Sequence, residues 1–77
     1  MNVVNETLNV NSEAIDTLKY NEQDENLIVK FTSGNKYIYR NVPRNKFLSW
    51  KYFDSFGKFF NSNIRNNYKF TKIYLFF

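Results

Sequence analysis

The sequence contains no cysteine and no histidine, and these two absences exclude most common site chemistries. Without cysteine there is no disulfide, no thiolate nucleophile and no thiolate ligand for a metal. Without histidine there is no side chain that titrates near neutral pH to serve as a general acid or base. We therefore expect a protein that is not an enzyme and has no catalytic residue, metal site or cofactor.

Glycine is also scarce, and long apolar runs are missing. Two glycines cannot supply a glycine-rich loop for phosphate groups. No stretch approaches the roughly 20 apolar residues of a membrane span, and the first residues lack the basic and apolar regions of a signal peptide. These features predict a cytoplasmic protein with no membrane partner.

Aromatic residues, by contrast, are abundant: nine Phe, six Tyr and one Trp occur among 77 residues. A chain this short buries a small share of its surface and has only apolar packing to stabilise it. Because a large ring buries about 150–250 Å², we expect aromatic packing to form the core of one domain.

Charge is distributed unevenly along the chain. Residues 1–26 carry six acidic side chains and one lysine, whereas residues 27–77 carry ten basic side chains and one acid. Such asymmetry suggests a polyanion or an acidic protein surface as the partner. The alternative is that the acidic third folds against the basic remainder and partly neutralises it.

Period-two alternation of apolar and polar residues predicts strands at 15–20, 27–31 and 36–40. The polar stretch 21–26 is typical of a hairpin loop, and Gly34 suits a tight turn because glycine tolerates a positive φ. These segments together indicate an antiparallel meander of at least three strands.

Helical spacing takes over after Pro43, whose fixed φ suits the first turn of a helix. We expect a first helix that extends to Asp54, a cap at Ser55 and a second helix over about 58–67. Residues 70–77 alternate weakly and favour a final strand over a helix extension. The predicted fold class is α+β, with a small antiparallel sheet of three to four strands and one or two helices packed on one face.

An ordered string of spaced residues also runs through most of the chain. It comprises Ser12, Ile15, Tyr20, Leu27, Val29, Phe31, Gly34, Tyr37, Tyr39, Val42, Pro43, Ser55, Gly57, Phe59, Phe60, Asn61, Ile64, Arg65 and Tyr68. In this string the chain resembles the KTSC domain family, a module named after the C-terminal region of some lysyl-tRNA synthetases that also occurs alone in bacterial and phage proteins. The resemblance implies binding of nucleic acid, in particular RNA. We therefore expect three segments along the chain: a polar leader or edge strand (1–11), a KTSC-like domain (12–70) and an apolar strand or tail (71–77).

The tyrosine pair and the tryptophan are candidates for stacking on bases. Tyr37 and Tyr39 share one face of a predicted strand, and Lys36 and Arg40 flank them in the sequence. RNA-binding sheets stack bases on such rings while nearby cations neutralise phosphate. The alternative is that the tyrosines face the helices as part of the core. Trp50 has the same two interpretations, as a stacking platform or as core packing.

The second predicted helix carries candidates for anion binding. Asn61 and Arg65 are four apart on one helix face and could clamp a phosphate or carboxylate; the alternative is a structural pair that binds a helix end or an acid. Lys58 and Lys69 form either a phosphate footprint or a solvated face. The full candidate set is Lys36, Tyr37, Tyr39, Arg40, Trp50, Lys58, Asn61, Arg65 and Lys69.

These residues suggest a non-enzymatic small binding module that binds RNA or a nucleotide through a basic aromatic surface. The alternative is a phage- or bacterium-encoded inhibitor or adaptor that binds a host protein through an aromatic patch in the host cytoplasm. A third interpretation is a homodimer in which Phe76 and Phe77 cover an exposed edge of the partner.

Overall fold

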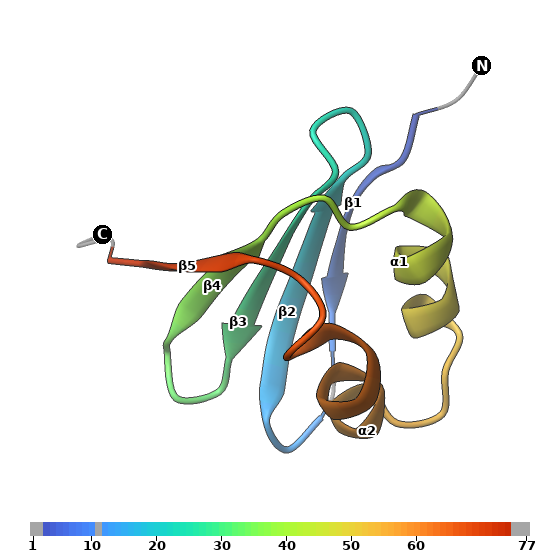
Figure 1. Ribbon diagram of the computed structural model, residues 1–77. Coiled ribbons are helices and arrows are strands. Elements are labelled where there is room, and N and C mark those ends of the chain that lie inside the picture. Colours follow the sequence, from blue (N-terminus) through green and yellow to red (C-terminus); the bar gives the residue numbers. More distant parts are fainter. Residues whose placement is uncertain (1–2, 11, 75–77) are drawn as a thin grey trace.

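Five antiparallel strands form one sheet in the computed structural model, which describes residues 3–10 and 12–74 (Figure 1). The strands are paired in sequence order, so the sheet is a plain meander whose last strand returns after the helices. The strands are β1 (Asn5–Asn9), β2 (Ile15–Asn21), β3 (Asn26–Phe31), β4 (Lys36–Tyr39) and β5 (Phe70–Ile73).

The helices lie between β4 and β5 in the sequence and on one side of the sheet in space (Figure 1). They are α1 (Arg44–Lys51), α2 (Phe56–Phe59) and the π-helical segment η1 (Phe60–Ile64), which continues α2. We call the sheet face that carries them the inner face and the opposite face the outer face. The α+β class expected from the sequence is therefore confirmed.

The predicted count of three to four strands is wrong, because the sheet has five. The three central strands and the turn at Gly34, whose φ is +97°, occur where the pattern placed them. The first and last strands are short and weakly patterned, and each is defined by backbone pairing with a neighbour: β1 with β2, and β5 with β4. Such pairing depends on tertiary structure more than on local sequence.

The helical region differs in detail from the prediction. The first helix ends at Lys51, before Asp54, because the chain turns there. The cap at Ser55 is confirmed, since its Oγ accepts the Lys58 backbone N–H at 3.3 Å. The second helix begins at Phe56 and widens into a π turn, in which the Arg65 backbone N–H donates to the Phe60 carbonyl at 2.9 Å.

The core between the sheet and the helices is largely aromatic. The rings of Tyr20 and Phe47 stack with centroids 4.6 Å apart, and those of Trp50 and Phe59 stack at 5.7 Å. The Tyr20 hydroxyl donates to the Val42 carbonyl at 2.7 Å, which satisfies both polar groups in the interior. These contacts join β2, α1 and α2 and fix the helices on the inner face.

Some expectations lie at the ends of the chain. The division into 1–11, 12–70 and 71–77 stays a prediction, and the dimer contact at Phe76 and Phe77 lies outside the described residues. Within residues 3–10 and 12–74, no helix has the length and apolar character needed to cross a membrane.

The buried hydroxyl of Tyr20 gives a stability prediction. Replacing Tyr20 with Phe leaves the Val42 carbonyl without its donor, so the free energy of unfolding should fall by about 1–3 kcal/mol. Denaturant unfolding measures this. Tyr52→Phe is the matched control, because Tyr52 is 77% exposed and its hydroxyl should contribute less than about 0.5 kcal/mol. Equal effects of the two changes would contradict the assigned hydrogen bond.

The same hydroxyl predicts sensitivity to alkali. Burial, with Glu25 and Glu22 nearby, raises the pKa of Tyr20 to about 12, whereas an unfolded tyrosine titrates near 10. The folded state therefore holds this proton over a range in which the unfolded state releases it, so stability is lost as pH rises from about 10 to 12. Across that range, the difference in unfolding free energy between wild type and Tyr20→Phe should shrink. A difference independent of pH would refute the shift.

Candidate functional site

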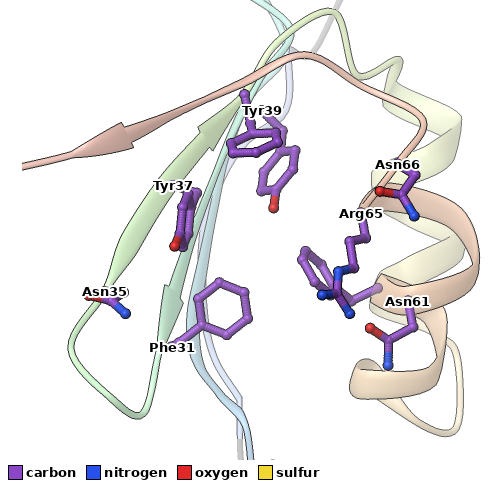
Figure 2. A pocket seen from close by; sticks show the side chains of 9 residues that line it. Phe31, Asn35, Tyr37, Tyr39, Asn61, Arg65 and Asn66 are labelled. Atoms are coloured by element: carbon purple, nitrogen blue, oxygen red, sulfur yellow. The ribbon is translucent and has the colours of Figure 1, made fainter.

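The helices leave the β4–β5 end of the inner face partly open, and a cavity of about 460 Å³ lies there between the sheet and the end of α2–η1 (Figure 2). We call it the aromatic cavity. Its volume falls within the range of about 300–1,000 Å³ that is typical of small-ligand sites. It is lined by Phe31, Asn35, Tyr37, Tyr39, Phe60, Asn61, Arg65, Asn66 and Phe70.

Five aromatic rings form its walls and contact one another mainly edge-to-face. Phe31 lies 5.7 Å from Tyr37 and 5.3 Å from Phe60, and Tyr37 lies 5.7 Å from Phe70, with interplanar angles of 76–79°. Tyr39 contacts both Phe60 and Phe70, at 5.8 and 5.5 Å. Tyr39 is only 3% exposed while Phe70 is 53% exposed, so the wall runs from the core to the open surface.

Polar side chains from the turn and the helix complete the lining. Asn35 follows Gly34 in the β3–β4 turn, Asn61 lies on η1, and Arg65 and Asn66 follow directly after it. Figure 2 shows Arg65 and Asn61 on the helix side, across the cavity from the rings of the sheet. Amides and a guanidinium provide many donors, and none of the described residues that line the cavity carries a carboxylate.

Arg65, the cation that lines the cavity, forms no ion pair with an acid among the described residues. Among the described residues, three ion pairs form: Glu6–Lys51 at 2.7 Å, Asp16–Lys30 at 3.7 Å and Glu22–Arg44 at 3.9 Å. Each pair joins an acid of residues 1–26 to a base of residues 27–77. This agrees with the alternative that the acidic third folds against the basic remainder and partly neutralises it. None of the three pairs involves the predicted cationic site residues Lys36, Arg40, Lys58, Arg65 and Lys69.

Arg65 acts electrostatically on Tyr39. Burial raises the pKa of the Tyr39 hydroxyl, the neighbouring Tyr37 raises it further, and the positive charge of Arg65 opposes both by lowering it. Both side chains line the aromatic cavity. A hydroxyl and a guanidinium therefore face the same space.

Four of the nine predicted site residues meet in this cavity: Tyr37, Tyr39, Asn61 and Arg65. The two tyrosines lie on the helix-covered face, as the core alternative expected, yet they also border the open cavity. The exposed side chains of Arg40, Lys58 and Lys69 do not line it. Lys36 precedes Tyr37 on β4 and lies on the outer face, because successive strand residues point to opposite faces.

Trp50 is not a stacking platform in this structure. Its side chain is 0% exposed and packs against Phe59 and Phe60 in the core. Its Nε1–H donates to the Phe56 carbonyl at 3.2 Å. A ring held in this way reaches a base only if α1 leaves the sheet, so Trp50 is removed from the candidate set.

Sequence reasoning missed five lining residues: Phe31, Asn35, Phe60, Asn66 and Phe70. The alternation that placed Tyr37 and Tyr39 on one face also indicated Phe31 on β3. Weak alternation predicted a strand at Phe70, but its place beside the cavity follows from the pairing of β5 with β4. Among the described residues, no three acidic side chains come together as a metal site requires.

Comparison with known proteins agrees with the fold. A family model described as "KTSC domain" matches residues 11–68. The crystal structure of a KTSC domain protein from Yersinia pestis matches with a TM-score of 0.85 and 24% sequence identity, covering 91% of this chain and 99% of that one. A comparison with curated proteins finds no match.

The coupling of Arg65 and Tyr39 gives a test of the cavity geometry. Replacing Arg65 with Gln removes the charge that lowers the pKa of Tyr39, so that pKa should rise. The ring carbon resonances of Tyr39, followed by NMR through an alkaline titration, measure it. Lys46→Gln, a loss of the same charge on α1, should leave the pKa of Tyr39 unchanged. An unchanged or lowered value in Arg65→Gln would contradict the arrangement.

Proposed function

The chain belongs to the KTSC domain family, and we propose that it is a non-enzymatic binding module whose aromatic cavity holds a base of RNA or of a free nucleotide. In this proposal the rings of Tyr37 and Phe70 stack on the base, and Arg65 binds a phosphate. The amides of Asn35 and Asn61 donate to and accept from the edge of the base.

The observation that carries the proposal is the composition of the cavity lining. Five rings, three amides and one guanidinium surround about 460 Å³, and no carboxylate is among them. Flat aromatic walls suit a planar ligand, since base–aromatic stacking contributes about 1–3 kcal/mol per base. A guanidinium fork matches the oxygens of a phosphate. A nucleotide combines the planar and the anionic part.

The proposed role is binding without catalysis. The sequence offers no histidine or cysteine, and the lining has no carboxylate that could move a proton. A guanidinium is always charged and does not act as a general base. The Tyr39 hydroxyl, with its raised pKa, stays protonated at neutral pH and serves as a hydrogen-bond donor. The cytoplasm, where RNA is abundant, is the proposed location.

A host protein is the second candidate partner, and one observation favours it. Tyr52 and Phe53 follow α1 and are 77% and 47% exposed. Phe53 packs on Phe59 at 5.3 Å, and the Lys51 Nζ lies 5.5 Å from the Tyr52 ring. Two exposed aromatic side chains in sequence suit an interface anchor of an inhibitor or adaptor.

Binding of a short single-stranded RNA of mixed sequence, measured by fluorescence anisotropy at low salt, tests the proposal. Tyr37→Leu keeps an apolar side chain and removes the aromatic face, so Kd should rise roughly 5- to 150-fold, as expected for about 1–3 kcal/mol of stacking. Arg65→Gln should weaken binding and also reduce its salt dependence, because a phosphate contact is lost.

Matched controls and salt separate the two candidates. Tyr52→Leu and Lys46→Gln remove an aromatic ring and a charge outside the cavity, and both should bind RNA as wild type does. Affinity for RNA should fall steeply as salt is added, unlike an aromatic protein interface. No change in RNA anisotropy at low salt, or equal losses of affinity in Tyr52→Leu and Tyr37→Leu, would contradict the nucleotide proposal.

A further inference from the structure

The outer face of the sheet has its own chemistry, distinct from that of the aromatic cavity. A depression of about 420 Å³ crosses all five strands there. It is lined by Thr7, Thr17, Lys19, Ile28, Lys30, Lys36 and Ile73, which we call the lysine face. It shares no residue with the aromatic cavity, and no described helix covers it, because all helices lie on the inner face (Figure 1).

The strand register concentrates positive charge on this face. Lys30 on β3 lies directly opposite Lys36 on β4, and like charges in a directly opposed cross-strand pair are destabilising. The nearest acid is Asp16, whose carboxylate lies 3.7 Å from the Lys30 Nζ with about half of its side chain exposed. Lys19 and Lys36 form no ion pair within the described residues. Asp16 offsets part of the Lys30 charge, and an anionic ligand would relieve the remaining repulsion.

We propose that the lysine face binds the phosphodiester backbone of a nucleic acid, independently of base sequence. Three ammonium groups on three adjacent strands suit a row of phosphates better than one small anion. The hydroxyls of Thr7 and Thr17 add donors for phosphate oxygens.

The residues on this face favour backbone contact over base stacking or membrane contact. None of the described large hydrophobic residues that are strongly exposed lies on it. Without an aromatic ring it cannot stack bases. Its isoleucines, Ile28 and Ile73, are half-buried among their neighbours and do not project as anchors for a lipid surface.

The two surfaces have different tasks and can be tested separately. Lys36 and Tyr37 are consecutive on β4 and serve opposite faces. The lysine face recognises charge alone, and the aromatic cavity recognises a base. A ligand that has phosphates but no bases should therefore bind the first surface without needing the second.

An abasic deoxyribose-phosphate oligomer is the probe for the lysine face. Wild type and Tyr37→Leu should bind it equally, with backbone amide shifts in NMR centred on β2, β3 and β4. The double variant Lys19→Gln, Lys36→Gln should bind more weakly. The slope of log affinity against log salt should be smaller by about 1.4, or about 0.7 for each lost phosphate contact.

The control is the double variant Lys46→Gln, Lys72→Gln, which removes the same charge outside both surfaces and should bind as wild type does. Equal salt slopes for the two double variants would overturn the proposal. The proposal would also be overturned if the protein did not bind the oligomer at low salt, or if it bound only vesicles of anionic lipid. Because the probe has no bases, failure here leaves the test of the aromatic cavity with RNA and Tyr37→Leu unaffected.

Discussion

The alternation of side chains along β4 is the constraint on which both surfaces depend. Successive residues of a strand point to opposite faces of the sheet, so Lys36 belongs to the outer face and Tyr37 to the inner face. The helices occupy the inner face only (Figure 1). One short strand therefore separates a surface of cations and hydroxyls from a cavity of rings, and a register slip by one residue would exchange them.

Aromatic packing joins the core to the aromatic cavity. With no disulfide available, the fold is stabilised by rings such as Trp50, which packs on Phe60 at 6.0 Å. Phe60 in turn contacts Tyr39 at 5.8 Å, and Tyr39 contacts Phe70 at the open end. The walls of the cavity are thus extensions of the core. Walls held in place before a ligand arrives lower the entropic cost of binding it.

The sequence predicted the central sheet and part of the site because both follow from local periodicity. Alternation located Tyr37 and Tyr39, and helical spacing placed Asn61 with Arg65. The sequence could not reveal that Trp50 is buried, since a helix at this position fits both a stacking and a core role. Nor could it reveal that Phe70 lines the cavity, since the place of β5 depends on its pairing with β4. The grouping of Lys36 with the tyrosines was an error of sequence proximity: neighbours along a strand lie on opposite faces.

The most direct test of the aromatic cavity as a base-binding site is a search for intermolecular NOEs between the base protons of a short RNA and the side chains of this protein. The account predicts NOEs from the bases to the ring protons of Tyr37 and Phe70, on the inner face beside Arg65. NOEs confined to Tyr52 and Phe53, or bases that contact only the outer face, would contradict it.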